Sequence, residues 1–399
     1  MNPWQRIFAP FAVGYFLSYL LRNANAVISP ELTGDLGLSS ADLGFLTSAY
    51  LLAFGAFQLP LGILLDRYGA RRVEAGLLLI CAAGCALFAS GTAMPQLTLG
   101  RALIGLGVSA CLMASFKAFS QWFPIERQAS LNAAIMAAGG LGALAASSPL
   151  GALLPLLGWR GIFFALAALS LVAAGLIFST PEKPAAHTPE GLRQQLAGLA
   201  TIFRSQAFWR LAPQMTLIVG GFMALQGLWT VPWLMQVNGL ARDAAAFHLL
   251  LMAGAQLCGF LFIAFFVIRL ARAGLPPARL LALGMGFGLV ALFAIVLDIA
   301  PTWLVWPSLG LVFSVGNLSY ALLSKEFPVQ LAGRANTALN LGAFLGAFGI
   351  QWLFGVAVDA FKGGGLEPAT AFRASLGVLL ALQALGWVWY VTGHARSPR

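Results

Sequence analysis

Charged side chains are scarce in this sequence. Only 9% of its 399 residues are Asp, Glu, Lys or Arg, whereas 60% are hydrophobic. A soluble domain carries about 25% charged residues, so the composition excludes an ordinary water-soluble protein. It is typical of a chain that lies largely inside a lipid bilayer.

Acidic residues are scarcer than basic ones, 13 against 23, and the formal net charge is +10. This excess does not predict a nucleic-acid partner, because the cations lie in short loops between apolar runs and form neither a basic run nor a basic amphipathic helix. Cations in short loops set the orientation of membrane spans. Most of them fall on the side of the N-terminus, so we expect both termini in the cytoplasm.

Groups that bind metals or catalyse reactions are also few. The chain has three histidines, and its four cysteines all lie in apolar runs, where buried thiols are the expected state. We find no metal-ligand cluster, nucleotide loop or catalytic triad, and expect no enzyme activity, no metal and no cofactor. His248 lies near an apolar run and is expected to be packed there, with proton handling as the alternative.

Long apolar runs dominate what is present. Each is about 20 residues long, enough for a helix to cross the bilayer. We count twelve, at 8–29, 43–64, 73–93, 97–119, 129–151, 160–179, 211–236, 245–268, 278–298, 302–323, 335–358 and 370–392. A polar stretch separates the sixth from the seventh. We therefore predict an all-α membrane protein with a six-helix bundle at 1–180, a cytoplasmic linker at 181–210 and a second six-helix bundle at 211–399.

The two halves share a sequence pattern. S-x-x-F-P occurs at 120–124 and again at 324–328, and each copy leads to an arginine and then to a glycine-rich run. This repetition indicates duplicated six-helix units. Transporters built from such repeats place the substrate site near the bilayer midplane.

The stretch GILLDRYGARRVEAG (62–76) resembles the loop signature of the major facilitator superfamily, G-x-L-x-D-R-x-G-x-R-[RK]. The resemblance implies a twelve-helix transporter, usually a monomer, that works by alternating access. It also implies that this charged loop takes part in gating, the alternative being plain loop charge that sets orientation. The predicted gating residues are Asp66, Arg67, Arg71, Arg72 and, in the fourth span, Arg101. For Arg101 a structural or gating role is expected, with substrate contact as the alternative.

Three further stretches resemble the organic-anion branches of that superfamily: the anion:cation symporters, the organophosphate exchangers and the nitrate porters. They are YLLRNANAV (19–27), RALIGLGVSACLMASFKAFSQWFP (101–124) and GWRGIFF (158–164). The resemblance implies that Arg22 binds an anion and that Lys117 assists, although Lys117 could instead reach the headgroups. Leu21 and Val108 stand where those branches often carry acids, so the coupling is left open between a proton, exchange and facilitated transport.

Arg22 lies near the middle of the first predicted span. A cation there costs about 2.5–3.5 kcal/mol on insertion scales, so it needs a partner. Glu31, Asp35 and Asp42 lie at or beyond the outer ends of the first two spans, and we expect no carboxylate within a first-half span. An anionic substrate would then supply the missing charge. The alternative is a structural arginine held by helix carbonyls or by Glu31.

The remaining candidate site residues are polar or aromatic. Asn23, Tyr15 and Tyr19 lie near Arg22 on the first helix. No basic residue lies in the middle of a predicted span of the second half, which offers amides and rings instead, each equally able to join helices. The predicted substrate contacts of this kind are Gln58, Gln226, Trp229, Asn317 and Asn340.

The sequence thus predicts a transporter of a small organic monoanion, such as a monocarboxylate, in a bacterial-type inner membrane. Its expected partners are that anion, the lipid bilayer and, if coupled, a proton. The alternative is a drug or amphiphile exporter of the same fold, in which Arg22 is structural.

Overall fold

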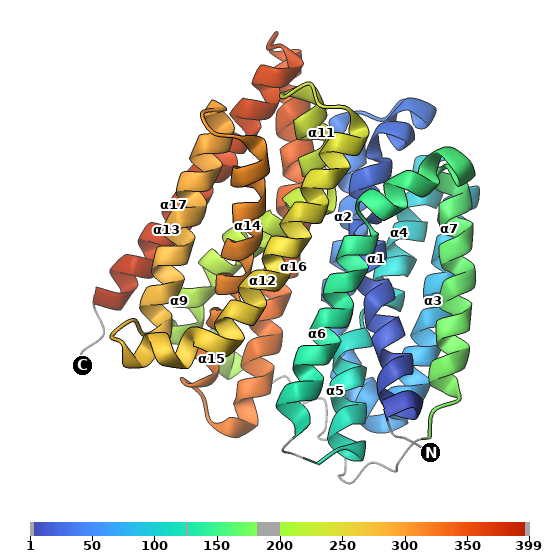
Figure 1. Ribbon diagram of the computed structural model, residues 1–399, viewed down its shortest axis with the longest axis vertical. Coiled ribbons are helices and arrows are strands. Elements are labelled where there is room, and N and C mark those ends of the chain that lie inside the picture. Colours follow the sequence, from blue (N-terminus) through green and yellow to red (C-terminus); the bar gives the residue numbers. More distant parts are fainter. Residues whose placement is uncertain (1–3, 125–126, 182–199, 396–399) are drawn as a thin grey trace. The chain divides into compact units, whose positions relative to one another are not determined.

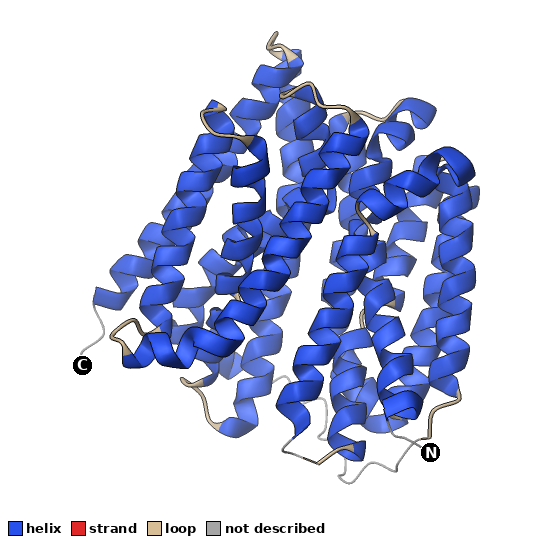
Figure 2. Cartoon of the chain, in the orientation of Figure 1, coloured by secondary structure: helices blue, strands red, loops and turns tan. Residues whose placement is uncertain are grey.

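The computed structural model describes residues 4–124, 127–181 and 200–395. These residues form helices joined by loops, and no strand occurs among them (Figure 2). Ten helical segments are long and apolar enough to cross a membrane. They coincide with ten of the predicted spans, and α1 (Ala9–Leu36) and α6 (Gln128–Ala145) lie at the other two positions. The prediction of an all-α membrane protein is confirmed, and a count of twelve spans fits the structure.

The chain divides into two compact units. Unit 1 consists of Met1–Leu38 and Phe45–Leu192, and unit 2 of Ser39–Gly44 and Arg193–Arg399. The main division therefore falls inside the predicted linker at 181–210. The first turn of α2 is grouped with unit 2, which hydropathy did not indicate.

The described residues of unit 1 form the helices α1 to α7, coloured blue to green in Figure 1. A short π-helical turn at Trp4–Phe8 precedes α1. The others are α2 (Ser40–Tyr68), α3 (Ala70–Ser90), α4 (Met94–Gly107), α5 (Cys111–Trp122), α6, and α7 (Ser148–Phe178). α7 begins well before the predicted span at 160–179 and is kinked at Gly158, whose φ of 62° suits a residue without a side chain.

Unit 2 begins with a seventh span assembled from short pieces. They are α9 (Gln206–Gln214), α10 (Gly220–Ala224) and α11 (Thr230–Gln236), joined by π-helical turns at Met215–Val219 and Leu225–Trp229. The remaining helices are α12 (Arg242–Arg272), α13 (Pro277–Leu297), α14 (Thr302–Gly316), α15 (Leu318–Ser324), α16 (Val329–Gly363) and α17 (Pro368–Ala395).

The fourth and tenth predicted spans are both broken. α4 ends at Gly107 and α5 starts at Cys111, while α14 and α15 meet at Asn317. Polar side chains satisfy backbone groups near both breaks, as a lipid environment requires. Gln58 Nε2 donates to the Ser109 carbonyl at 3.0 Å, and Asn317 Nδ2 donates to the Phe313 carbonyl at 3.1 Å.

Glycines let helices approach closely within each unit. A Cβ at Gly142 of α6 would overlap the Phe16 carbonyl of α1, and one at Gly107 would overlap the Cys81 backbone of α3. In unit 2, a Cβ at Gly310 would overlap the Met252 carbonyl. Small residues at such contacts are how apolar helices pack in a bilayer.

An aspartate caps the first turn of α2 within unit 2. Asp359 of α16 accepts hydrogen bonds from the backbone N–H groups of Ser40 (3.2 Å) and Ala41 (2.6 Å). These amide groups lie at the helix start and have no partner within the helix. The carboxylate also interacts favourably with the positive end of the helix dipole.

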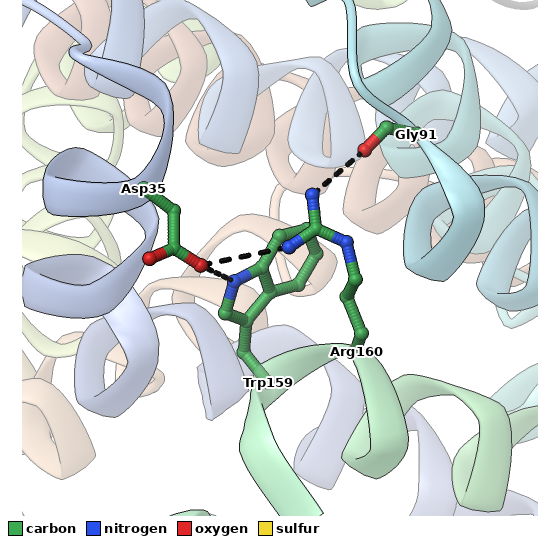
Figure 3. Close-up of polar contacts among 4 residues, drawn as sticks. All are labelled: Asp35, Gly91, Trp159 and Arg160. Atoms are coloured by element: carbon green, nitrogen blue, oxygen red, sulfur yellow. Dashed lines mark hydrogen bonds and ion pairs between the residues drawn. The ribbon is translucent and has the colours of Figure 1, made fainter.

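The GWR stretch ties together three loop ends of unit 1 (Figure 3). Asp35 at the end of α1 accepts a hydrogen bond of 2.8 Å from the Trp159 indole and lies 3.5 Å from Arg160 Nη1. Arg160 stacks on Trp159 at 4.1 Å and donates to the Gly91 carbonyl at 3.3 Å. Because Trp159 is buried, its indole N–H depends on Asp35 for a partner.

We expect Asp35→Ala to destabilise unit 1 by about 1–3 kcal/mol, because it leaves the buried indole N–H of Trp159 unsatisfied. Asp35→Asn keeps an acceptor oxygen and loses only the ion pair with the partly exposed Arg160, which contributes about 1 kcal/mol or less. Thermal unfolding of the detergent-purified variants, followed by circular dichroism, measures the difference. Equal unfolding temperatures for the two variants would show that the indole hydrogen bond contributes little.

Candidate functional site

Arg22 lies among aromatic rings in unit 1. Its guanidinium carbon is 4.7 Å from the ring centre of Tyr19 and 5.1 Å from that of Phe54 on α2. Tyr50 and Tyr15 also interact with it electrostatically. Ring faces attract a cation, and more strongly where water is scarce. Arg22 remains partly exposed, although its Nε is buried, and the rings hold the cation in place.

The two tyrosines predicted to accompany Arg22 contact each other on α1. Their ring centres are 5.2 Å apart in an edge-to-face arrangement. The Tyr15 hydroxyl donates weakly to Met136 Sδ at 3.7 Å, and Gly139 of α6 lies directly against both rings. The structure therefore brings Tyr15, Tyr19 and Arg22 together, as the spacing predicted; their binding role stays a prediction.

The two asparagines beside Arg22 are buried and hold helices. Asn23 Nδ2 donates to the Tyr19 carbonyl one turn earlier at 2.9 Å. Asn25 Nδ2 donates to Thr47 Oγ1 of α2 at 3.1 Å. These hydrogen bonds explain why amides occur in this apolar helix, because they stabilise α1. For the present Nδ2 donor of Asn23 to contact a substrate, its hydrogen bond to the Tyr19 carbonyl would have to break.

Arg101 is fully buried between helices. Its Nη1 donates to the Leu21 carbonyl of α1 at 3.3 Å, and its guanidinium lies 5.0 Å from the Tyr50 ring and 5.9 Å from the Phe88 ring. Tyr50 thus lies between the two arginines and donates its own hydroxyl to the Ser18 carbonyl at 3.2 Å. These contacts favour a structural role for Arg101 over contact with a substrate, and its role in gating stays a prediction.

Lys117 lies away from the Arg22 cluster. Its Nζ donates to the Leu65 carbonyl near the end of α2 at 2.8 Å. Leu65 lies eleven residues beyond Phe54, or about 16 Å along the helix. An ammonium near the end of a helix suits the negative end of its dipole. In this conformation Lys117 supports α2, and Gln58 supports the break at Ser109.

Some of the arginines of the signature loop (62–76) interact with other residues of unit 1. Arg71 Nη1 donates to the Thr180 carbonyl at 3.3 Å, and its guanidinium lies 5.4 Å from the Phe178 ring at the end of α7. Arg67 stacks on the neighbouring Tyr68, and Arg72 is exposed. The side chain of Asp66 lies outside the described residues. Gating by this loop stays a prediction.

Sequence reasoning missed Glu74. It lies five residues into α3, inside the predicted span at 73–93, and is 0% exposed. Neither carboxyl oxygen has a hydrogen-bond partner among the described residues. The expectation that no carboxylate lies within a first-half span is therefore wrong. The only signal was an acidic residue just after a basic loop, which looks like loop charge.

In unit 2 the predicted contacts also have partners. Gln226 Nε2 donates to Gln256 Oε1 at 3.2 Å, joining the seventh span to α12. Trp229 Nε1 donates to the Gln351 carbonyl at 2.9 Å, and its ring packs on Phe354 at 4.9 Å. Both candidates lie in the π-helical turn Leu225–Trp229. Such turns are frequent at functional sites, although these contacts equally hold helices together.

Two more unit 2 candidates lie at or near the break in the tenth span. Asn317 forms the break, and Asn340 Oδ1 of α16 accepts a hydrogen bond of 2.7 Å from the Tyr320 hydroxyl of α15. His248 is packed, with its ring nitrogens 2.8 Å from the Ala244 carbonyl and 2.9 Å from Thr302 Oγ1. These polar groups fix the short helix α15 against α16 and α12 against α14.

Comparison with known families identifies the class of protein. The model of the Major Facilitator Superfamily matches residues 11–350. The chain belongs to this superfamily, and it is a multi-pass membrane transporter, not an enzyme.

Three relatives show what kind of member it resembles. The probable L-galactonate transporter of Escherichia coli (strain K12) is 29% identical over 158 residues, 40% of this chain and 35% of that protein. The probable galactarate/D-glucarate transporter GudP of Bacillus subtilis (strain 168) is 24% identical over 396 residues, 90% of this chain and 86% of that protein. Efflux pump hmp6 of Hypomyces subiculosus is 26% identical over 394 residues, 96% of this chain and 66% of that protein. The chain thus matches about a third of the length of the L-galactonate transporter.

Solved structures show the same fold. A bacterial homologue of the human lysosomal transporter Spinster, crystallised in an inward-facing and occupied conformation, superimposes with a TM-score of 0.81 at 17% identity. The match covers 100% of this chain and 98% of that one. At this identity the likeness shows the fold alone.

We expect Gly139→Ala to disturb the tyrosine pair beside Arg22. The added Cβ would lie 2.6 Å from Tyr15 Cε1 and 3.0 Å from Tyr19 Cδ2, so the rings must shift at a cost of about 1–3 kcal/mol. Gly175→Ala in α7 is the matched control, because nothing lies within 4 Å of its Cβ and alanine favours the helix by about 1 kcal/mol. Thermal unfolding should rank Gly139→Ala below wild type and Gly175→Ala at or above it. The reverse order would contradict the packing.

Proposed function

We propose that this protein transports a small organic monoanion, a sugar acid with one carboxylate, by alternating access. The observation that carries the proposal is Arg22: a partly exposed arginine inside a membrane-spanning helix, held by Tyr19, Phe54 and Tyr50. A guanidinium offers two parallel donors that match a carboxylate. The rings and hydroxyls around it suit the apolar and hydroxyl surfaces of a sugar acid.

The cations of unit 1 favour a single negative charge. Arg101 is buried and donates to the Leu21 carbonyl. Lys117 donates to the Leu65 carbonyl, which lies about 16 Å along α2 from Phe54, one of the rings beside Arg22. A dianion would need a second cation close to the first, and these two are otherwise engaged. Two relatives named above, described as probable transporters of L-galactonate and of galactarate/D-glucarate, support sugar acids as the class. Galactarate and D-glucarate are dianions, so the proposed preference for one charge rests on the cations of unit 1.

We further propose that the protein lies in the inner membrane of a bacterial-type cell with both termini in the cytoplasm, as the distribution of loop cations favours. The amides of Gln226, Asn317 and Asn340 are proposed to contact the substrate after exchanging their present partners. The signature loop is proposed to act in gating.

A second candidate function is export of drugs or amphiphiles. The observation that favours it is the similarity to efflux pump hmp6 along 96% of this chain. In that case Arg22 would be structural, and its interactions with Tyr50 and Tyr19 would be its whole purpose.

We expect the detergent-purified wild type to bind L-galactonate, and Arg22→Gln to bind it at least about tenfold more weakly, or by about 1.4 kcal/mol. The affinity of Arg22→Lys should lie between those of wild type and Arg22→Gln, because an ammonium keeps the charge but lacks the planar pair of donors. Isothermal titration calorimetry with L-galactonate, the dianion galactarate and neutral galactose tests both the site and the charge preference.

The matched control is Arg272→Gln, which removes the same charge from an exposed position at the end of α12. It should bind L-galactonate as wild type does. If Arg22→Gln also binds like wild type, the arginine is structural and export of drugs or amphiphiles becomes the favoured function. Tighter binding of galactarate than of L-galactonate would contradict a monoanion site.

A further inference from the structure

Glu74 is a buried acid that the proposed anion site does not use. It is 0% exposed, and both oxygens lack a hydrogen-bond partner in the described part of the chain. Three helices cover it: Gly14 of α1 lies directly against Oε1, Ile177 of α7 lies beside the same place, and Cys111 of α5 interacts with the carboxyl group. The carboxyl group of Glu74 is therefore enclosed by helices α1, α5 and α7.

An ionised carboxylate is poorly suited to this place. Burying a charge without a partner is among the most costly arrangements in a protein, and an apolar side chain of similar volume would be more favourable. Ionisable groups inside membrane spans mark proton and ion pathways for this reason. The surroundings accept the neutral acid, which means a carboxyl group that carries a proton.

The charged groups on the helices packed against α3 do not neutralise it. Arg101 of α4 donates to the Leu21 carbonyl, Lys117 of α5 to the Leu65 carbonyl, and Arg71 of α3 itself to the Thr180 carbonyl. From α5, the titratable group that faces the carboxyl is the thiol of Cys111. From α1 and α7 the neighbours are Gly14 and Ile177.

Helix α1 connects Glu74 with the anion site. Gly14 of α1 lies directly against Glu74 Oε1. The next residue, Tyr15, packs edge-to-face on Tyr19, whose ring centre lies 4.7 Å from the guanidinium carbon of Arg22. A movement of α1 would therefore change the surroundings of Glu74 and of Arg22 together.

We propose that Glu74 is the proton-binding site of this transporter, linked to the anion at Arg22 through helix α1. The proposal rests on the proposed anion transport for its biological role, while proton binding itself does not. In the conformation described here Glu74 holds the proton; it releases the proton when α1, α5 and α7 admit water. A monoanion and a proton that load together add no net charge to unit 1.

The first test needs no substrate. Infrared difference spectra of the full-length protein in lipid vesicles, recorded between acidic and alkaline pH, detect the carbonyl stretch of a buried carboxylic acid. We expect this band in wild type and in Glu367→Gln, which removes an exposed carboxylate of unit 2, and its loss in Glu74→Gln. An unchanged band in Glu74→Gln overturns the proposal. Should that variant fail to fold, Cys111→Ser must shift the wild-type band, and an unshifted band overturns it equally.

The second test separates coupling from binding. Proteoliposomes with L-galactonate measure counterflow exchange, which needs no net proton movement, and accumulation driven by a pH gradient. We expect Glu74→Gln to keep counterflow and to lose accumulation above the external concentration. Accumulation at the wild-type level in Glu74→Gln overturns the coupling role. If wild type moves no L-galactonate in either assay, the proposed function fails, and the infrared band alone decides whether Glu74 binds a proton.

Discussion

The low tolerance of a lipid bilayer for charge is the constraint on which the structure of unit 1 depends. Water cannot solvate a cation within the span, so each needs a protein or substrate partner. Arg101 uses the Leu21 carbonyl and two rings, and Lys117 uses the Leu65 carbonyl. Arg22 lies on the faces of Tyr19 and Phe54 and stays partly exposed. Because these three cations have such different surroundings, the same residue type serves as a brace in one helix and as a candidate receptor for an anion in another.

The same constraint governs the amides. At the breaks in the fourth and tenth spans a polar side chain binds a backbone carbonyl, as Gln58 does at Ser109 and Asn317 at Phe313. These side chains were predicted to contact the substrate, and here they hold the backbone. The two uses are compatible, because an amide has a second N–H and a carbonyl oxygen beside the N–H used here. Discontinuous helices at such positions are how repeat-built transporters combine binding with movement.

Much of the fold could be predicted because hydropathy reports directly on lipid contact, and long apolar runs admit few other structures. The breaks at 108–110 and at Asn317 could not, because averaging over twenty residues hides a local change of direction. Arg22 stood out as a lone cation in an apolar run. Glu74 did not, because it follows Arg71 and Arg72 closely and its burial depends on Gly14, Cys111 and Ile177, which are distant in sequence. The partnership of Asp35 with Trp159 was hidden for the same reason.

Placing an acid and an anion-binding arginine in one unit has an electrical consequence. A monoanion that crosses alone moves one charge through the membrane potential, at about 2.3 kcal/mol per 100 mV. With a proton on Glu74 the loaded unit carries no additional charge, so its movement becomes independent of the potential and responds to the pH gradient. The empty unit returns after Glu74 has released its proton, and the charges of Glu74 and Arg22 then cancel, so neither the loaded nor the empty movement carries net charge. A neutral amphiphile brings no charge for the proton to balance, so the buried carboxyl of Glu74 and the partly exposed guanidinium of Arg22 are best understood together, as the partners of a proton and an anion.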